Sequence, residues 1–528
     1  MQKFYAVDTE DDTKGTTSII DFFDGEFHFT FTGEQCRYKA WGFLHQISPA
    51  VVWACNAEYD LLNIFGADWL GKLCTLQYVK AGFMRGCFRE CKVTFFDTYR
   101  HWPVSVKRMG ELLGFPKLDM PHNMETMGCT CNDCVTYCQR DAEITYKFTA
   151  AMLEQYYNLG LYKIKATLPG MAIQFFKQEF YFKEFPRINS YCKRLFRRGY
   201  YGGRVEVYQT GLIEGDIQHY DVNSLFPSVM KKFSYPELSS LEVKTDPDLE
   251  REGMFEGYLN VPYSKYPCLP IRDEEILFPV GPVFGCWPYP EIRQLLKDGG
   301  SIVNVRECVE FEETENPFDR YVDFCYQQRL KSANPIEKEF WKLMLNSLYG
   351  KFGSHGEIET IYDDEVVKVG GEAKYSNVVW SAYVTSYARL HLLKFLRSTT
   401  ECYYTDTDSL FTPDLLPTST VLGELKREGE YSQAWFKGNK LYTLDGTVKA
   451  KGVPKLNQLE FFQTGKTSYL KPTRYRESRK TSKKANHWLA VEKHIINGYT
   501  KRRIVNNGST EPWTMVAYKK FMREGGNQ

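Results

Sequence analysis

Long hydrophobic runs are absent from this sequence of 528 residues. A transmembrane helix needs about 20 consecutive apolar residues, so we expect no segment that crosses a membrane and no membrane partner. A secretory signal peptide is not expected either, because charged residues occur already within Met1–Asp8. These absences predict an intracellular protein, and its length predicts several domains.

A regular cysteine framework is also missing, although the chain contains 15 cysteines. We therefore expect reduced thiols rather than disulfides. The exception is a dense group with His122 nearby: Cys129, Cys131, Cys134 and Cys138. Four converging ligands of this kind would bind zinc, but the spacing is irregular, and Cys138 would have to turn away from a neighbouring helix face. On the sequence, zinc binding and a metal-free thiol cluster both stay open.

A strong net charge is lacking, since 67 Lys and Arg oppose 66 Asp and Glu. The charges are nevertheless segregated. The segment from Lys471 to the C-terminus contains 14 basic and 4 acidic residues, an excess of +10, which leaves −9 for the rest of a chain whose total is +1. A basic end on an acidic body suggests a polyanionic partner. A solvated tail without a partner is the alternative.

Two carboxylates one residue apart, Asp406 and Asp408, lie between aromatic and apolar residues. A tight turn through Thr407 would bring them together at the tip of a hairpin. Like charges this close repel unless a cation lies beside them, and carboxylate oxygens suit magnesium. An ordinary acidic turn is the alternative, since Asp and Ser favour turns.

More acids lie at the ends of predicted strands. The strand Phe4–Glu10 ends in Asp8 and Glu10, which point to one face. A second strand breaks at Asn56 and opens a helix that carries Asp60. A strand near residue 220 ends in an acid as well, Asp221, before the turn Ser-Leu-Phe-Pro.

Tyr137 and Asp141 are spaced i, i+4 and share one face of a predicted helix. Asp141 joins Asp8, Glu10 and Asp60 to give the four carboxylates that a two-metal phosphodiester hydrolase needs. Tyr137 is placed to orient the water. Each acid considered alone is more typical of a surface residue, so the ordered set carries the prediction.

Two further stretches have the chemistry of phosphate contacts. Paired glycines stand between basic and aromatic residues in Arg197–Arg204, and glycine lets the backbone approach a phosphate closely. Lys342, Asn346 and Tyr349 are spaced as one helix face, where a lysine can neutralise a triphosphate. A simple glycine turn and an amphipathic helix are the respective alternatives.

In this order the motifs resemble those of the family B DNA polymerases. The acids of the first part match the D-x-E, N-x-x-x-D and Y-x-x-x-D motifs of the family's 3′–5′ exonuclease domain. The later stretches match Y-x-G-G, D-x-x-S-L-Y-P, K-x-x-x-N-S-L-Y-G, Y-x-D-T-D-S and K-x-Y, the last at Lys440–Tyr442. The resemblance covers essentially the whole chain.

The resemblance implies a role for each matching residue. The implied exonuclease ligands are Asp8, Glu10, Asp60 and Asp141, and the other catalytic residues there are Tyr137 and Lys117. The implied polymerase residues are the metal ligands Asp221, Val222 (through its carbonyl) and Asp406, with Asp408 in support. The implied nucleotide-binding residues are Lys342, Asn346, Tyr349, Phe226, Lys338 and Lys331. The implied DNA-binding residues are Tyr200, Gly202, Gly203, Asn56, Tyr59, Thr98, Lys440 and Tyr442.

Two positions depart from the family motifs. Phe226 stands where the family usually has tyrosine, and since either ring blocks a 2′-hydroxyl, we expect selectivity for deoxynucleotides. Tyr99 replaces the leucine that follows Ser or Thr at a contact to single-stranded DNA, whereas Thr98 matches.

The K-x-x-hydrophobic motif Lys117–Met120, the compact chain and room for insertions around the fingers resemble the protein-primed subgroup. Its members come from small linear-genome phages, adenovirus-like viruses and linear plasmids. In the subgroup the first insertion holds the terminal (priming) protein and DNA, and the second encircles the template. Here the second insertion comprises only about 20 residues, Ser354–Lys374, which predicts weak strand displacement.

The implied fold is α/β and α+β, with a ribonuclease H-like exonuclease domain and a right-hand polymerase of palm, fingers and thumb. The predicted domains are exonuclease 1–165, linker with template-binding motif and first palm part 166–275, first terminal-protein region 276–315, fingers 316–352, second terminal-protein region 353–376, second palm part 377–450, and basic thumb 451–528.

The implied cofactor is Mg²⁺, two ions per active site, with Mn²⁺ able to replace it. The implied partners are primer-template DNA, deoxynucleotides and a priming protein. The implied state is a monomer or a heterodimer with the priming protein, in the cytoplasm or nucleus of a host. One alternative is a family B polymerase that is primed by nucleic acid or needs no primer. The other is a DNA-binding replication factor without catalysis, which the intact carboxylates argue against.

Overall fold

The computed structural model describes residues 3–12, 14–80, 82–122, 128–185, 188–370, 375–472, 474–479, 488–495 and 498–526. The chain divides into two compact units, and each is assembled from segments far apart in sequence. The first comprises Met1–Glu179, Cys325–Lys374 and Leu470–Val491, and the second Phe180–Phe324, Tyr375–Tyr469 and Glu492–Gln528. No helix in the described ranges is both long and apolar enough to cross a membrane.

A nine-stranded sheet forms the centre of the first unit, in the order β19-β18-β5-β6-β7-β4-β1-β2-β3. The N-terminal strands are β1 (Tyr5–Asp11), β2 (Thr17–Phe23), β3 (His28–Thr32), β4 (Val51–Ala54), β5 (Cys74–Val79), β6 (Gly82–Phe88) and β7 (Val93–Asp97). The strands β1, β4 and β7 run parallel, and the other pairs are antiparallel. The predicted first strand, and the second strand followed by a helix after Asn56, are confirmed.

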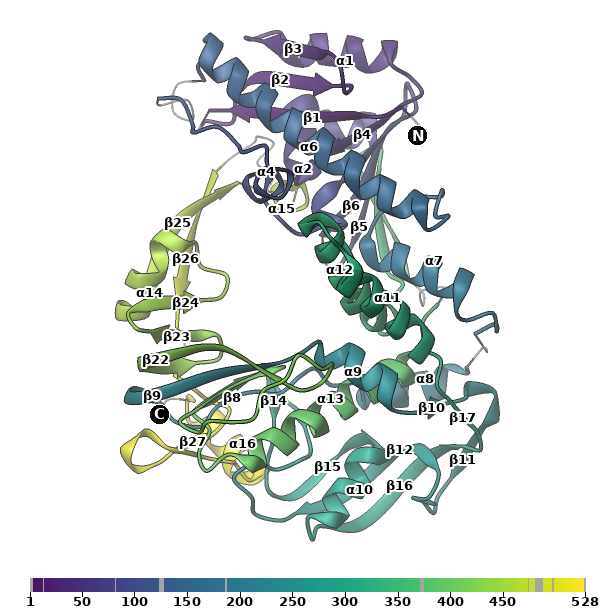
Figure 1. Ribbon diagram of the computed structural model, residues 1–528, viewed down its shortest axis with the longest axis vertical. Coiled ribbons are helices and arrows are strands. Elements are labelled where there is room, and N and C mark those ends of the chain that lie inside the picture. The colour runs from purple at the N-terminus through teal and green to yellow at the C-terminus, as the bar shows by residue number, and fades with distance from the viewer. Residues whose placement is uncertain are drawn as a thin grey trace. The chain divides into compact units, whose positions relative to one another are not determined.

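Helices cover both faces of this sheet. The long helix α6 (Asn132–Asn158) crosses one face over β1 and β2, while α1 (Cys36–Gln46) and α2 (Ala57–Phe65) pack on the other (Figure 1). Successive side chains of a strand point to opposite faces. Alternate residues of β1 therefore contact the helices on different faces of the sheet. Tyr5 and Val7 join the core with α1 and α2, whereas Asp8 faces α6, where Cys138 Sγ lies 3.7 Å from Asp8 Oδ2.

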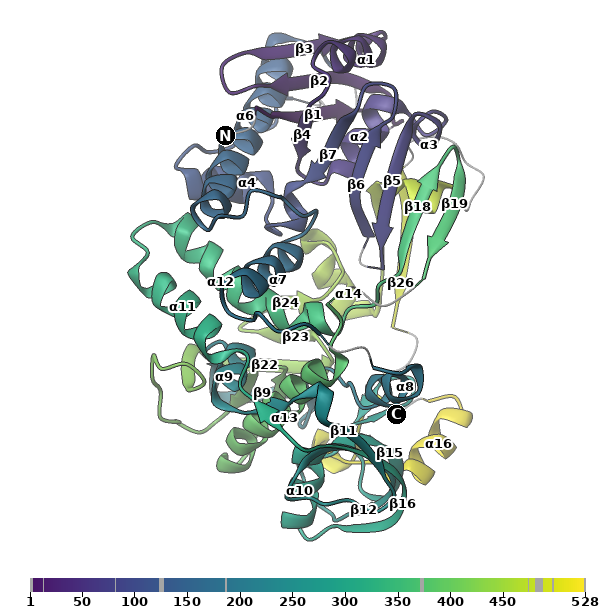
Figure 2. The same cartoon turned by 90° about the vertical axis from the view of Figure 1, so that its right-hand side faces the viewer.

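The segment predicted as the second insertion forms a hairpin of β18 (Ile358–Tyr362) and β19 (Glu365–Val369). It adds two strands to the edge of the sheet, because β18 pairs with β5 through Thr360 and Gln77 (Figure 2). Residues 371–374 of the predicted insertion lie outside the described ranges. In the same unit, α12 (Pro335–Phe352) packs on α7 (Leu168–Glu179), α6 and α4 (Val106–Leu113).

The second unit contains a seven-stranded sheet and a four-stranded sheet. The larger one has the order β24-β23-β22-β9-β21-β20-β8 and consists of β8 (Val205–Val207), β9 (Gly211–Val222), β20 (Tyr404–Asp406), β21 (Ser409–Thr412), β22 (Leu425–Gly438), β23 (Leu441–Leu444) and β24 (Thr447–Ala450). The smaller one has the order β11-β16-β12-β15 and consists of β11 (Leu241–Lys244), β12 (Glu252–Val261), β15 (Gly281–Pro288) and β16 (Ser301–Phe311). Two of its strands, β15 and β16, come from the predicted first insertion, 276–315.

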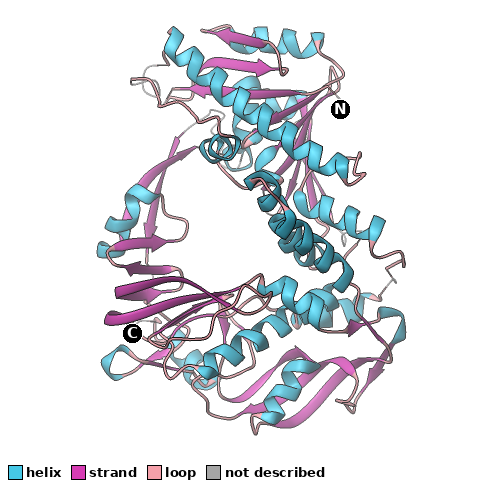
Figure 3. Ribbon diagram, in the orientation of Figure 1, coloured by secondary structure: helices cyan, strands magenta, loops and turns pink. Residues whose placement is uncertain are grey.

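Helix α13 (Val378–Ser398) is buried along most of its length in this unit. It packs against α8 (Ser190–Arg198), α9 (Leu225–Lys232), α10 (Tyr289–Lys297) and strand β15 (Figure 3). The helix carries a buried arginine, Arg389, among apolar neighbours. Such a charge needs a partner within the unit.

The predicted basic thumb, 451–528, is split between the units. Its last part, with β27 (Arg503–Ile504), β28 (Thr510–Glu511) and α16 (Met515–Arg523), packs on the second unit, where Leu277, Trp513 and Tyr518 share a cluster. Arg502 is fully buried and pairs with Glu206. This arginine is not available to grip DNA, because it neutralises a carboxylate in the interior.

Candidate active sites

Four acidic side chains gather at one end of the first unit's sheet. Asp8 and Glu10 come from β1, Asp60 from α2 and Asp141 from α6, so three elements far apart in sequence supply them. Asp8, Glu10 and the thiol of Cys138 each offer an atom within 4.8 Å of the others. Asp60 accepts a hydrogen bond from Thr9 Oγ1 at 2.8 Å. The structure therefore brings together the acids predicted for the exonuclease site.

Burial and mutual repulsion raise the pKa of these carboxyls. Burial first, and then the charge of Asp141, raise the pKa of Glu10 to about 8. Burial raises the pKa of Asp60 to about 8, although the bond from Thr9 lowers it. The pKa of Asp8 lies well above its ordinary value, because of burial first and then the charges of Asp141, Glu10 and Asp60. A site built this way favours a bound cation, since only positive charge allows all four acids to ionise.

Lys117 supplies part of that charge. Its ammonium forms an ion pair with Asp141 and lies 4.4 Å from the centre of the Tyr137 ring. Burial lowers the pKa of Lys117, but the charge of Asp141 and their hydrogen bond raise it above the ordinary value. Burial raises the pKa of Tyr137 to about 12, so this phenol stays protonated at neutral pH. Among the described residues, the buried Asp141 Oδ1 has no hydrogen-bond partner, which fits a metal ligand.

A cavity of about 480 Å³ lies beside this site, lined by Cys55, Asn56, Tyr99, Ser105, Val106, Lys107 and Lys117. Asn56 and Tyr99 are exposed. Thr98 is not, and its hydroxyl donates to the carbonyl of Ala54. The hydroxyl of Thr98 is thus used inside the fold, and the contact of this residue with DNA stays a prediction. Tyr59, predicted to bind DNA, donates its hydroxyl to Asp11.

The second group of acids lies in the middle of the seven-stranded sheet. Asp406 ends β20, and the turn passes through Thr407 with a φ of 66° before β21 begins at Ser409. Ser409 pairs with Asp406 on one side and with Asp221 of β9 on the other. The Val222 N–H donates to the carbonyl of Asp408 at 2.7 Å. The predicted hairpin with the acids at its tip is confirmed, and Asp221 lies two strands from Asp406.

The ammonium of Lys440 forms an ion pair with the carboxylate of Asp406. Its Nζ lies 2.5 Å from both carboxylate oxygens, and its backbone N–H donates to Tyr404 Oη at 2.9 Å. Burial, then the charge of Asp406, raise the pKa of Asp408, while Lys440 lowers it. The Lys440 ammonium thus balances the charge of Asp406. The donor set around this turn, which consists of carboxylates and backbone carbonyls, fits Mg²⁺.

The Y-x-G-G segment contacts the same turn. The backbone N–H of Thr407 donates to the carbonyl of Arg204 at 2.7 Å. A Cβ on Gly203 would lie 2.8 Å from Thr407 Cγ2, so this position has no room for a side chain. Gly203 therefore permits close packing against the acidic turn, whereas Gly202 is exposed.

The predictions missed the side chain that holds this segment. Arg389 donates to the carbonyls of Tyr201 and Gly202 at 3.0 and 2.9 Å and to Glu291 at 2.9 Å, and both side chains of the pair are buried. The signal was present in the sequence as the first charged residue after eleven uncharged ones, 378–388. A buried network of Arg204, Glu206 and Arg502 was also missed.

The predicted nucleotide-binding residues lie in both units. Lys342, Asn346 and Tyr349 are on α12, and Asn346 donates to the Lys342 carbonyl at 3.0 Å. Lys338 is on the same helix and Lys331 ends α11 (Asp319–Lys331). Phe226 lies on α9 of the second unit, and Tyr442 on β23 packs against Tyr404. Their assembly into one pocket with Asp221 and Asp406 stays a prediction.

A family model matches residues 123–390, half of the chain, with the description DNA polymerase type B, organellar and viral. The DNA-directed DNA polymerase of Enterobacteria phage PRD1 is 26% identical over 476 residues, which cover 81% of this chain and 80% of that protein. A probable DNA polymerase of Neurospora intermedia is 26% identical over 368 residues, which cover 59% of this chain but only 37% of that protein.

The fold is similar to a solved structure of Phi29 DNA polymerase complexed with primer-template DNA. The TM-score is 0.75 at 17% identity, covering 94% of this chain and all of the other. A ternary complex of the same polymerase with primer-template DNA and incoming nucleotide substrates gives a TM-score of 0.74. These matches show that the chain has the fold predicted from its motifs.

Proposed function

Since the chain belongs to the type B DNA polymerases of organelles and viruses, we propose that it is a template-directed DNA polymerase with a 3′–5′ proofreading exonuclease. The family confirms the resemblance inferred from the motifs. The observation that supports both activities is the presence of two separate acidic sites, one at the end of β1 and one around the β20–β21 turn. A replication factor without catalytic activity would need neither acidic site.

Family B DNA polymerases depend on metal ions, and we propose Mg²⁺ at both sites. Asp221, Asp406 and the Val222 carbonyl would hold it at the polymerase site, and the four acids of the first unit at the exonuclease site. Bound there, Mg²⁺ stabilises negative charge that develops on the attacking and leaving oxygens.

The side chains of the chain itself supply orientation and charge. Lys342 balances the charge of the incoming triphosphate from α12, and the ring of Phe226 excludes a 2′-hydroxyl. At the exonuclease site, Tyr137 orients the attacking water through its protonated hydroxyl, and Lys117 keeps Asp141 ionised. The cavity beside Asn56, Tyr99 and Lys117 accepts the frayed 3′ end.

We further propose that a protein supplies the primer. The segment that corresponds to the first terminal-protein region forms part of a four-stranded sheet with α10 against it, which offers a rigid surface for a partner. The second region is reduced to the β18–β19 hairpin. Strand displacement is therefore expected to be weak, because five-residue strands leave little chain to encircle a template.

Paired assays test these proposals. Extension of a primed template with four deoxynucleotides should occur in Mg²⁺, should be lost in Asp406→Ala and should persist in Asp8→Ala. Degradation of single-stranded DNA should show the opposite pattern. No extension by the unmodified protein from a good primer would contradict the polymerase assignment.

A third reaction tests protein priming, with template, one labelled deoxynucleotide and the candidate priming protein. Label joined to a hydroxyl of that protein supports protein priming. Extension from a nucleic-acid primer, with no label on the protein supplied, favours the nucleic-acid-primed alternative.

A further inference from the structure

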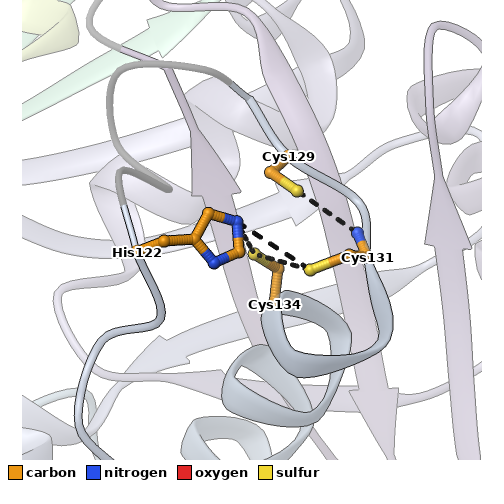
Figure 4. A group of neighbouring side chains, drawn as sticks. All are labelled: His122, Cys129, Cys131 and Cys134. Carbon is orange, nitrogen blue, oxygen red and sulfur yellow. Dashed lines mark hydrogen bonds between the residues drawn. The ribbon is translucent and has the colours of Figure 1, made fainter.

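Three cysteines and one histidine converge beside the exonuclease site. The ligand atoms of His122, Cys129, Cys131 and Cys134 all lie within 4.8 Å of one another (Figure 4). His122 lies five residues after Lys117, Cys129 and Cys131 directly precede α6, and Cys134 lies in its first turn. Cys138, the fourth cysteine of the sequence cluster, is absent from the group, because its thiol contacts Asp8 instead. Histidine replaces the cysteine as the fourth ligand.

The separations match the edges of a tetrahedron around a metal ion. Cys131 Sγ lies 3.5 Å from Cys134 Sγ and 3.9 Å from His122 Nε2, and Cys134 Sγ lies 3.7 Å from the same nitrogen. Zinc bonds of about 2.3 Å to sulfur and about 2.0 Å to nitrogen place tetrahedral ligands roughly 3.5–3.8 Å apart. The atoms of Cys131, Cys134 and His122 are therefore spaced as ligands of one ion, and Cys129 Sγ lies within 4.8 Å of each of them.

The donor set selects the class of metal. Three thiols and an imidazole suit zinc, whereas magnesium and calcium prefer oxygen. The backbone N–H of Cys131 also donates to Cys129 Sγ at 3.5 Å, as outer partners of ligands in metal sites do. A disulfide does not explain the group, because 3.5 Å between Cys131 and Cys134 exceeds an S–S bond of about 2.05 Å.

We propose that His122, Cys129, Cys131 and Cys134 bind one structural zinc ion. The ion joins two segments that the exonuclease uses. Lys117 lies five residues before His122, while Tyr137 and Asp141 follow Cys134 on α6 at one and two turns. Because Lys117 and Asp141 form an ion pair, a cross-link between their segments fixes that pair. The four ligands are positioning residues, and the ion contacts no DNA and no reacting atom.

Metal analysis of the purified full-length chain tests the site. After dialysis against metal-free buffer, the unmodified protein should retain one zinc per chain by plasma mass spectrometry. Cys129→Ser and Cys131→Ser should each lower this content at least several-fold. Cys87→Ser is the matched control, since Cys87 is a partly buried thiol of β6 in the same unit, and it should retain the zinc. Equal zinc content in all four proteins, or none in any, would overturn the proposal.

Cobalt replacement gives a readout that is independent of catalysis. Co²⁺ in the exchanged protein should show the absorption of a tetrahedral thiolate site, and His122→Ala should change that spectrum while the thiolate bands persist. A thiol count that shows Cys131 and Cys134 oxidised to each other in the protein as isolated would also overturn the proposal. Circular dichroism of each variant establishes that the fold is retained.

Activity then tests the positioning role. Loss of zinc in Cys131→Ser should lower exonuclease activity about tenfold and leave primer extension unchanged. Unchanged exonuclease activity in a zinc-free variant would overturn the positioning role. The zinc content does not depend on polymerase or nuclease activity, so a failure of the proposed function would leave this measurement intact.

Discussion

At the scale of single residues, the buried carboxyl of Glu10 suits metal binding but lowers the stability of the metal-free protein. Its pKa is about 8 in the folded state and 4.5 as the ordinary value. Between these values the folded state binds more protons than the unfolded state, so the metal-free protein should lose stability as the pH rises from about 5 to 8. Glu10→Gln should remove that loss and raise the free energy of unfolding by roughly 4 kcal/mol at pH 8 and by less than about 1 kcal/mol at pH 5.

Chemical denaturation without metal at both pH values measures this effect. Glu26→Gln is the control, because Glu26 is an exposed acid of the same unit, and it should change stability little at either pH. Adding Mg²⁺ should stabilise the unmodified protein more than Glu10→Gln. Equal stability of Glu10→Gln and the unmodified protein at pH 8 would mean that Glu10 is ionised in the folded protein without a cation.

Lys117 sets the pH at which the same site can ionise. The ammonium lowers the pKa of Asp8, Glu10 and Asp141. Lys117→Met should therefore shift the rise of exonuclease rate with pH upward by about one unit and lower the rate at pH 7 by about tenfold or more. A pH–rate profile on single-stranded DNA measures both effects.

Lys107→Met is the matched control for this change. Lys107 lines the same cavity as Lys117, and the structure gives it no carboxylate partner among the described residues of the site. Its profile should keep the original pH dependence. If both variants lower the rate without moving the profile, the role of Lys117 is to contact DNA and not to tune the acids.

At the scale of elements, the motifs predicted the strands, the helix and the hairpin that carry the candidate site residues. The strands of Asp8 and Asp221, the helix after Asn56 and the hairpin around Thr407 all appear where the motifs indicate. Local signals suffice there, because an apolar strand and a polar turn residue lie within a few positions of each other. Arg389 was missed because its partners Glu291 and Tyr201 lie about 100 and 190 residues away in sequence. The burial of Thr98 could not be predicted, because a motif match carries no information on burial.

Arg389 gives the prediction at this scale. Arg389→Met leaves Glu291 buried without its partner and frees the carbonyls of Tyr201 and Gly202. The free energy of unfolding should fall by about 3–5 kcal/mol. In the double variant Arg389→Met with Glu291→Leu the loss should be clearly smaller, since no charge remains unpaired. A double-mutant cycle by denaturation measures the coupling, and additive losses would contradict the pairing.

At the scale of the whole molecule, the linear order of motifs did not reveal that the compact units are discontinuous. The predicted domains follow one another along the chain, whereas the first unit takes in residues from three segments. The β18–β19 hairpin shows why, since it completes a sheet whose other strands lie nearly 300 residues earlier. Edge pairing of this kind leaves no local pattern, because the backbone supplies the hydrogen bonds.

The basic C-terminal segment gives a prediction that depends on the whole molecule. Its excess of ten positive charges would release counterions from about ten phosphates, a slope near −9 of log affinity against log salt. In the described part of the segment, six basic residues already lie within 4.0 Å of a carboxylate: Lys471, Arg476, Lys501, Arg502, Arg503 and Lys520. Such residues release few counterions on binding, which leaves 8 of the 14 basic residues (14 − 6), so we expect a slope of about −7 or shallower. Fluorescence anisotropy of labelled primer-template over a range of NaCl concentrations measures it. A slope near −9 would mean that the ion pairs open on DNA, and no slope would mean that this end of the chain grips no phosphates.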